Sequence, residues 1–393
     1  MTSQSADVYT ASAGGSVAVA EASATPVGDG LDKYSSILMI FVDGLPFDDR
    51  SAVVPPDWHS VPHIPTLGYS VNIEAELFAG ATAEDLGWFC EWNPGASRNR
   101  WQIALAKLAA LTRRNEYMDY AAHRLLDRLY GERIYNVPLE CIGQLQRDGR
   151  LPYEQGFPRE TLFQKFDIRF LEQSAPGDTS DDDVVRHAIE RIASGERRLF
   201  VPLVQLDSLT HAHGLTGDIR QDHLVQLRDN IATLWQAMLA SDPTALAVLI
   251  SDHGFADVTL SVDVHMPSLL KRTGGIADTV YTVESTLARI WCKGPTQRDA
   301  VSHDLSMRDY GRVLSTDERR QYSIADKRFG DVIFVANEGV TFVPCTMTKR
   351  TVCAGMHGYL PDSPTQWGLI STSAPIFDGP ARSSEFYHVL AGA

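Results

Sequence analysis

The stretch Leu246-Ala-Val-Leu-Ile-Ser-Asp252-His253-Gly254 decides the fold that the sequence predicts. Its apolar, β-branched run is typical of a buried strand, and the run stops abruptly on an acid, a histidine and a glycine. A parallel strand that ends this way places two metal-ligand side chains at the carboxyl edge of its sheet, where open α/β sheets bind ligands. Taken alone, such a tripeptide is more often a turn that holds a hydrogen-bonded histidine than a ligand site.

The same kind of strand end returns elsewhere in the chain. The side chains that follow or flank these ends are Asp43 after the run at 36–42, Asp207 and His211 after the run at 199–206, and His357 between two glycines. If these acids and histidines were unrelated to one another, they would be scattered over the sequence. Because these groups gather at the ends of apolar runs, we infer that they share one site.

The order of elements predicts an α/β protein. Strands are expected at 36–42, 199–206, 246–252, 288–292, 331–335 and 340–343, and helices at 71–79, 101–130, 180–195 and 218–240. Asn337-Glu-Gly is a suitable hairpin turn between the last two strands. The predicted architecture is a three-layer sandwich with a mostly parallel central sheet and a helical insertion. Its parts are a disordered tail at 1–35, a catalytic core at 36–90 and 195–393, and an insertion or lid at 91–194.

Composition restricts the class of partner. The 393 residues carry a formal net charge of -15, which disfavours a nucleic-acid polymer or an anionic membrane as a partner. A small phosphate ester remains compatible, because bound divalent cations can invert the local field. The five cysteines form no CxxC pair, and the first thirty-odd residues lack a basic region followed by an apolar one. We therefore expect reduced thiols and a cytoplasmic protein.

The spacing Asp207-x-x-x-His211 brings a carboxylate and an imidazole to one side of a helical turn. Such a pair suits a divalent ion such as zinc, although a hydrogen-bonded Asp-His pair without metal explains the spacing equally well. His357 would complete this first metal site. Two such ions can bind a phosphoryl oxygen between them and stabilise the attacking and leaving oxygens.

A second metal site would use Asp43, Asp252 and His253, and its ion would activate a hydroxyl nucleophile. Ser70 is predicted at the start of the helix at 71–79, where the helix N-terminus favours an incoming anion. The alternative for Ser70 is a plain N-cap. Thr66 is the second choice of nucleophile. His213 is expected to be a spectator or a substitute ligand for His211.

With these residues in hand, the chain resembles the alkaline phosphatase superfamily, and within it the type I phosphodiesterase/nucleotide pyrophosphatase branch. The resemblance rests on four segments in order: Val42-Asp43-Gly44, Asp207-x-x-x-His211-x-x-Gly214, Ser251-Asp252-His253-Gly254 and Gly355-Met-His357-Gly358-Tyr359. The family places its nucleophile ten residues before a glycine that precedes a P-E-x-x-G-like segment, and Ser70 stands at that distance from Gly80. Where the branch often has asparagine, three residues past the nucleophile, this chain has Ile73, with Asn72 one place earlier.

The resemblance implies a hydrolase of phosphate esters with two divalent metal ions, expected to be zinc. Asp207, His211 and His357 would hold one ion, and the other would lie among Asp43, Ser70, Asp252 and His253. Ser70 would form a phospho-enzyme intermediate that a zinc-activated water releases. The expected activity is that of a phosphodiesterase or nucleotide pyrophosphatase.

Alternatives are a phosphomonoesterase for a small metabolite, a mutase or phosphonate hydrolase, and a catalytically silent binding protein on the same scaffold. No cysteine lies in the Cys-x-Pro/Ala-x-Arg motif of sulfatases, so a sulfatase is not expected. Neither the leaving group nor the oligomeric state follows from the sequence.

Four aromatic residues lie near the start of the insertion: Trp88, Phe89, Trp92 and Trp101. They could stack on a flat group of the substrate, or they could form the core of the insertion. The second interpretation is the stronger of the two. We expect substrate specificity to depend on residues 88–195.

Overall fold

The computed structural model describes residues 30–95, 141–147, 149–171, 180–348 and 351–392, together with residues 121, 124, 125, 128, 137 and 138. Most of the predicted tail and most of the predicted helix at 101–130 therefore lie outside the described residues. Leu31 is fully buried and donates its backbone N–H to the carbonyl of Leu390, at 2.9 Å. The packed core thus begins before residue 36, where the sequence placed its boundary.

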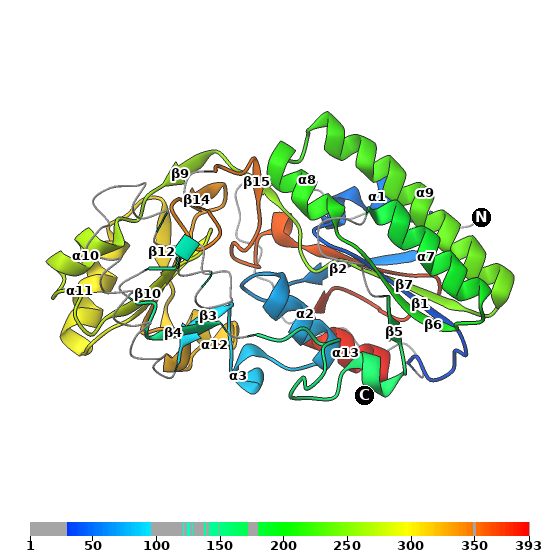
Figure 1. Ribbon diagram of the computed structural model, residues 1–393, viewed down its shortest axis with the longest axis horizontal. Coiled ribbons are helices and arrows are strands. Elements are labelled where there is room, and N and C mark those ends of the chain that lie inside the picture. The colour runs from blue at the N-terminus through cyan, green and yellow to red at the C-terminus, as the bar shows by residue number, and fades with distance from the viewer. Residues whose placement is uncertain are drawn as a thin grey trace, which may run out of the picture.

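A seven-stranded sheet forms the centre of the larger lobe (Figure 1). In spatial order its strands are β17 (Ala381–Arg382), β2 (His59–Ile64), β16 (Gly368–Thr372), β7 (Leu246–Ile250), β1 (Ile37–Val42), β6 (Arg198–Leu203) and β5 (Arg169–Phe170). The four strands from β7 to β5 are parallel, and β16 is antiparallel to both of its neighbours. This confirms the predicted α/β fold with a mostly parallel sheet.

Helices cover both faces of this sheet, which explains why β1 is apolar throughout. Alternate β1 residues such as Leu38 and Ile40 pack against α1 (Arg50–Val53), α7 (Asp181–Ala193) and α9 (Asp218–Ser241). The other set, which includes Met39 and Phe41, packs against α2 (Ser70–Ala79), α6 (Leu162–Lys165) and α13 (Ser383–Ala391). The result is the expected three-layer arrangement.

The smaller lobe is built on a separate antiparallel sheet that the sequence did not distinguish from the core. Its strands, in spatial order, are β10 (Val280–Val283), β11 (Leu287–Trp291), β13 (Val332–Ala336) and β12 (Gly311–Val313). Helices α10 (Met266–Arg272) and α11 (Pro295–Ser306) pack on one face of it. The predicted hairpin at Asn337-Glu-Gly is wrong. A turn is present, but β14 (Val340–Phe342) leaves the sheet and pairs in parallel with β9 (Leu260–Val262).

The predicted insertion is only partly separate from the core. Strand β5 extends the main sheet, and α7 packs on it, although both lie within 91–194. Upstream, β3 (Trp92–Pro94) pairs with β4 (Leu145–Arg147) beside the smaller lobe. Buried Arg289 of β11 fastens this segment, because its guanidinium donates to Oδ1 of Asn93 at 3.0 Å. The core therefore takes up part of the stretch assigned to a lid.

Short elements complete the described chain. They are η1 (Phe47–Asp49), α3 (Ala83–Leu86), α8 (Gln205–His213), β8 (Ala256–Asp257), α12 (Thr316–Gln321), η2 (Lys327–Phe329), β15 (Gly355–Met356) and η3 (Pro364–Gln366). Strand β15 pairs with β8 between the two lobes (Figure 1). Within the described ranges, no helix has the length and apolar character needed to cross a bilayer.

Candidate metal centre

The carboxyl ends of three neighbouring parallel strands bring the predicted ligands together. Asp43 follows β1, Asp207 lies in the first turn of α8 just after β6, and Asp252 and His253 follow β7. Since β1 lies between β6 and β7, all three ends meet at one edge of the sheet. The structure therefore brings these predicted residues together at one sheet edge.

The first group of ligand atoms consists of Asp207, His211 and His357. The Nε2 atoms of His211 and His357 lie 3.4 Å and 3.8 Å from Oδ1 of Asp207. His357 comes from the turn after β15, so the strand between the two lobes supplies the third member. One potential ligand atom from each residue lies within 4.8 Å of the others, which is a suitable spacing for a single cation.

The second group consists of Asp43, His253 and, again, Asp207, within the same 4.8 Å limit. The Nε2 atom of His253 lies 3.6 Å from Oδ1 of Asp43 and 3.3 Å from Oδ2 of Asp252. The rings of His253 and His357 stack at a centroid distance of 3.6 Å, which joins the two groups. Asp207 thus lies between the predicted sites, whereas the sequence assigned it to the first alone.

The carboxylate oxygens of this centre fit a cation on the evidence of their own hydrogen bonding. Among the described residues, Oδ1 of Asp43, Oδ1 of Asp207 and Oδ2 of Asp252 are buried without a hydrogen-bond donor. Buried anionic oxygens are rarely left this way, because desolvation without a partner is costly. Carboxylates with imidazole nitrogens form a donor set that zinc and similar divalent ions accept.

Hydrogen bonds outside the cluster orient the imidazoles. His211 donates from Nδ1 to the carbonyl of Gly355 at 2.9 Å, and His253 donates from Nδ1 to the carbonyl of Gly254 at 3.1 Å. With Nδ1 bound to a carbonyl, each ring directs Nε2 at the centre. A bound cation would take the place of any proton on that nitrogen.

The loop after β1 is locked to the loop after β7. The N–H of Gly44 donates to Oδ1 of Asp252 at 3.1 Å, and the N–H of Leu45 donates to the hydroxyl of Ser251 at 2.8 Å. Gly44 has φ +70°, and a Cβ there would lie 2.5 Å from the ring of Phe255. Only glycine permits this close approach, so it fixes the orientation of Asp43 relative to Asp252.

Ser70 is the first residue of α2, and its hydroxyl donates to Nε2 of His253 at 3.2 Å. The predicted N-cap role for Ser70 is wrong: the cap position is Tyr69, with φ -129° and ψ 169°. Asn72 satisfies the helix start instead, because its Oδ1 accepts the N–H of Tyr69 at 2.8 Å and its Nδ2 donates to the carbonyl of Leu67 at 3.1 Å. The Ser70 hydroxyl is thus available to the cluster.

Tyr69 connects this helix start to the smaller lobe. Its hydroxyl donates to Oγ1 of Thr286 at 2.8 Å and accepts the N–H of the same residue at 2.9 Å. Thr286 in turn donates to the carbonyl of Gly358 at 2.8 Å, next to His357. The residue before the predicted nucleophile and the residue after a predicted ligand therefore share one anchor on the loop between β10 and β11.

Burial and crowding shift the acidities of the cluster. Burial and the charges of neighbouring acids raise the pKa of Asp43 well above its ordinary value, and burial raises the pKa of Asp252. Burial opposes a low pKa at Asp207, but the adjacent His211 lowers it below its usual range. Burial likewise opposes a high pKa at His211, yet contacts that include Asp207 raise it to about 10. The cluster therefore carries an excess of buried acidity that a cation would relieve.

The remaining residues considered from the sequence lie apart from the centre. His213 is exposed at the end of α8. The side chain of Thr66 hydrogen-bonds Glu76, and its N–H donates to Ser383. Trp88, Phe89 and Trp92 are buried as expected, but they lie in three separate hydrophobic clusters shared with the two lobes and do not form a core of the insertion; Trp101 lies outside the described residues.

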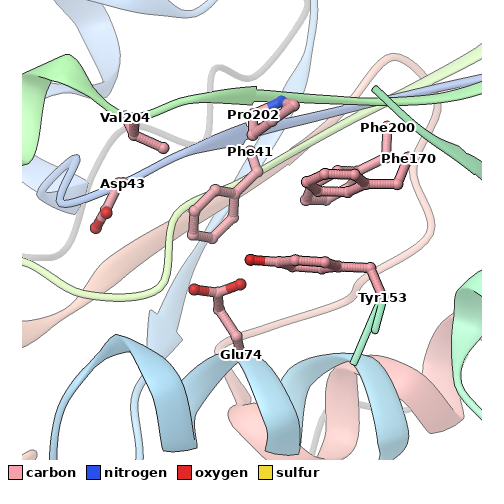
Figure 2. A pocket seen from close by; sticks show the side chains of 8 residues that line it. All are labelled: Phe41, Asp43, Glu74, Tyr153, Phe170, Phe200, Pro202 and Val204. Atoms are coloured by element: carbon pink, nitrogen blue, oxygen red, sulfur yellow. The ribbon is translucent and has the colours of Figure 1, made fainter. Parts of the chain in front are cut away.

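A cavity of about 370 Å³ adjoins the centre at Asp43; we call it the Glu74 cavity (Figure 2). It lies between β1, β6 and α2, and its lining residues are Phe41, Asp43, Glu74, Tyr153, Phe170, Phe200, Pro202 and Val204. Glu74 is 7% exposed, and burial raises its pKa well above the ordinary value. Sequence reasoning missed Glu74. The signal was a glutamate four residues after Ser70, one of two on a mostly apolar helix.

The family profile described as type I phosphodiesterase/nucleotide pyrophosphatase matches residues 74–360, which include Asp207, His211, Asp252, His253 and His357. No curated protein matches the chain at a significant level.

Among solved structures, human ectonucleotide pyrophosphatase/phosphodiesterase 5 is similar, with a TM-score of 0.62 and 15% identity over 91% of this chain and 94% of that one. The murine protein of the same name has a TM-score of 0.60 and 14% identity over the same shares of the two chains. An inactive threonine-to-alanine variant of the murine protein, in complex with AMP, has a TM-score of 0.59. These structures share the fold of this chain.

At the start of α2, the residue that caps the helix and the predicted nucleophile are different residues. We expect Asn72→Ala to lower the free energy of unfolding by about 2 kcal/mol, because two buried backbone groups lose their partner. Ser70→Ala should cost less than about 1 kcal/mol, because it removes one hydrogen bond and no cap. Urea denaturation of the metal-free proteins measures both values. A larger loss for Ser70→Ala than for Asn72→Ala would return Ser70 to a capping role.

Proposed function

The chain belongs to the type I phosphodiesterase/nucleotide pyrophosphatase family. On this basis we propose that it hydrolyses phosphodiesters with the help of two divalent cations, which we expect to be zinc. Ser70 is the proposed nucleophile. The observation that carries the proposal is the hydroxyl of Ser70 at the start of α2, which takes no part in capping the helix and hydrogen-bonds Nε2 of His253 at 3.2 Å, beside three carboxylates that lack donors. The murine relative that holds AMP supports a small ester with a nucleotide-like phosphate.

The residues divide between two cation sites. Asp207, His211 and His357 would hold one ion, and Asp43, Asp252 and His253 would hold the other, within reach of Ser70. The ions, when bound, polarise the phosphoryl oxygens and favour ionisation of the attacking hydroxyl. The carboxylate oxygens and imidazole nitrogens of both sites already face one another across the cluster.

Ser70 performs the covalent step. Its Oγ forms a bond to phosphorus while the ester bond to the leaving group breaks, and its proton passes to solvent. The N-terminus of the ten-residue helix α2 favours the anionic group that is transferred. Water then attacks the phosphoserine on the opposite side, which releases the second product and restores the hydroxyl. Each displacement inverts the configuration at phosphorus.

The charge of the site favours a diester over a monoester. Two divalent cations balance the three carboxylates of the cluster and the single negative charge of a phosphodiester. A monoester dianion brings a further negative charge, and neither the predicted ligands nor the lining of the Glu74 cavity includes a lysine or arginine. The additional charge has no partner in this set of side chains.

We expect the zinc-loaded protein to hydrolyse an aryl phosphodiester with kcat/KM at least about tenfold above that for the matching monoester, a difference of about 1.4 kcal/mol. Steady-state assays of 4-nitrophenol release provide the measurement. A preference for the monoester would instead indicate a phosphomonoesterase on this scaffold. Hydrolysis of neither ester, in protein that also fails to retain zinc, would favour a silent binding protein.

Replacing the nucleophile should separate turnover from metal binding. Ser70→Ala is expected to reduce turnover to background while the zinc content stays at about two ions per chain, because the charged ligands remain. Thr66→Val is the matched control, and it should retain activity because Thr66 contacts Glu76 and not the cluster. Activity lost in Thr66→Val and kept in Ser70→Ala would reassign the nucleophile.

Asp252→Asn should affect metal-free and zinc-loaded protein in opposite directions. The amide preserves the acceptor for the N–H of Gly44 and removes one of the crowded buried charges. We therefore expect a higher melting temperature without metal, a smaller increase on adding zinc, and a zinc content nearer one ion per chain than two. Calorimetry with metal analysis tests this, and a less stable metal-free variant with full zinc content would contradict it.

A further inference from the structure

A turn in the smaller lobe buries three polar residues. The connection between β10 and β11 is Glu284-Ser285-Thr286, and these residues are 5%, 4% and 0% exposed. Connections between strands normally lie at the surface, where water satisfies their polar groups. This one instead lies against the start of α2, because its last residue hydrogen-bonds Tyr69. We call residues 284–286 the Thr286 turn.

Hydrogen bonds to neighbouring strands fix the Thr286 turn. The carbonyl of Thr286 accepts the N–H of Ala336, at the end of β13, at 2.8 Å. The carboxylate of Glu284 pairs with buried Arg289 of β11 at 2.8 Å and accepts the hydroxyl of Thr282 at 3.2 Å. The turn is therefore held on several sides by the sheet of the smaller lobe, and its backbone offers a rigid point of attachment.

From this turn the Thr286 hydroxyl contacts two segments of the candidate metal centre. Its Oγ1 accepts the hydroxyl of Tyr69 at 2.8 Å and donates to the carbonyl of Gly358 at 2.8 Å. Tyr69 immediately precedes Ser70, and Gly358 immediately follows His357. A Cβ on Gly358 would lie 2.9 Å from Oγ1 of Thr286 and 2.9 Å from Cε1 of Tyr69. One hydroxyl thus joins the segment of the nucleophile to the segment of a ligand.

His357 lacks the side-chain anchor that the other two imidazoles of the centre have. Nδ1 of His211 and Nδ1 of His253 each bond a carbonyl, whereas Nδ1 of His357 is buried without a partner among the described residues. Its ring meets the Tyr69 ring edge-on at 5.7 Å and stacks on His253 at 3.6 Å. Metal-ligating histidines depend on an outer partner for their orientation. For His357 that part falls to the Tyr69 ring and to the backbone that Thr286 holds.

The start of α2 does not need Thr286 for capping. Asn72 already accepts the N–H of Tyr69 and donates to the carbonyl of Leu67. The hydroxyl contact between Tyr69 and Thr286 therefore adds nothing to the hydrogen bonding of the helix itself. Its effect is to fix where the first turn of α2 lies relative to the smaller lobe.

Resting on the proposed function, we propose that Thr286 is a positioning residue for the reaction. It fixes Ser70 through Tyr69, and it fixes His357 through the carbonyl of Gly358. No atom of Thr286 belongs to either ligand group. Its contribution is to keep the attacking hydroxyl and a ligand of the first ion in one relation, which an in-line displacement requires. The smaller lobe thereby controls the geometry of phosphoryl transfer without supplying a reacting group.

Removing the Thr286 hydroxyl should slow turnover more than it weakens substrate binding. We expect Thr286→Val, at saturating zinc, to lower kcat for bis(4-nitrophenyl) phosphate at least about tenfold with KM within about threefold of wild type. The reason is that misplacement of the reacting groups acts on the chemical step. Thr286→Ser keeps the hydroxyl and should hold kcat within about threefold of wild type. Wild-type kcat in folded Thr286→Val, or an equal loss in Thr286→Ser, would overturn the proposal.

Two further variants separate positioning from the mere loss of a buried hydrogen bond. Thr341 of β14 is 2% exposed and shares one hydroxyl hydrogen bond with Ser261, at 3.0 Å, so Thr341→Val is the matched control and should keep wild-type kcat. Tyr69→Phe removes the hydroxyl that contacts Thr286 and keeps the ring. We expect the double variant Tyr69→Phe/Thr286→Val to lose less kcat than the product of the single losses, because both changes break one link. Multiplicative losses would contradict this, and if Thr286→Val fails to fold, wild-type kcat in Tyr69→Phe overturns the proposal.

Zinc affinity provides a readout that does not depend on hydrolysis. Competition with a chromophoric chelator measures the Kd of each ion in each variant. Loss of the outer anchor of a metal-ligating histidine typically costs roughly ten- to a hundredfold in affinity. We therefore expect Thr286→Val to raise the Kd of one ion at least about tenfold and to leave that of the other nearly unchanged, because only His357 loses its anchor. Thr341→Val should leave both values unchanged. Wild-type affinities in Thr286→Val would overturn the part assigned to His357.

The two readouts distinguish failure of this inference from failure of the proposed function. If wild type hydrolyses the diester and Ser70→Ala does not, but Thr286→Val equals wild type in kcat and zinc affinity, the inference is wrong and the function stands. If wild type hydrolyses no ester while Thr286→Val still weakens one zinc ion and Thr341→Val does not, the positioning of His357 stands and the hydrolytic function is wrong. If wild type neither hydrolyses the ester nor binds zinc, both are wrong.

Discussion

Three carboxylates at one edge of a parallel sheet, Asp43, Asp207 and Asp252, impose the constraint on which the rest of the structure depends. Each has an oxygen that is buried without a donor, and their mutual repulsion disfavours the fold unless a positive charge is present. The fold tolerates this because the surrounding strands are apolar and covered on both faces, which gives a rigid support for an unfavourable centre. The repulsion among these carboxylates thus lowers the free energy of unfolding of the metal-free protein, and cation binding at the same carboxylates can raise it again.

The two lobes meet at the same centre. His357 comes from the strand between the lobes, and Tyr69 anchors the start of α2 to Thr286 of the smaller lobe. Because Thr286 also holds the carbonyl of Gly358, displacement of the smaller lobe would move Ser70 and His357 together. The relative position of nucleophile and ligands is therefore a property of both sheets.

Local sequence patterns were informative where one short segment contained both the strand and its chemistry. The apolar runs before Asp43 and Asp252 form adjacent strands, and the spacing of Asp207 and His211 corresponds to a helical turn of α8. Patterns failed in two different ways. At the start of α2 the helix begins one residue earlier than expected, so that the nearby Asn72 and not Ser70 supplies the capping hydrogen bond. Strand β14 pairs with β9 some eighty residues earlier instead of with β13, and this choice has no local signature because it depends on which surface the folded chain presents.

The sequence by itself determined the fold class, the family and the set of acids and histidines at strand ends, since hydrophobic periodicity and ligand spacing are properties of neighbouring residues. Only the tertiary structure decided that Asp207 lies between the two ligand groups, that Glu74 is buried in an aromatic cavity, and that Tyr153 reaches it from a distant segment. The physical reason is that burial and electrostatic crowding arise from segments that meet only after folding. Two glutamates lie on α2, and which of them lines a cavity is decided by the side chains that enclose each one.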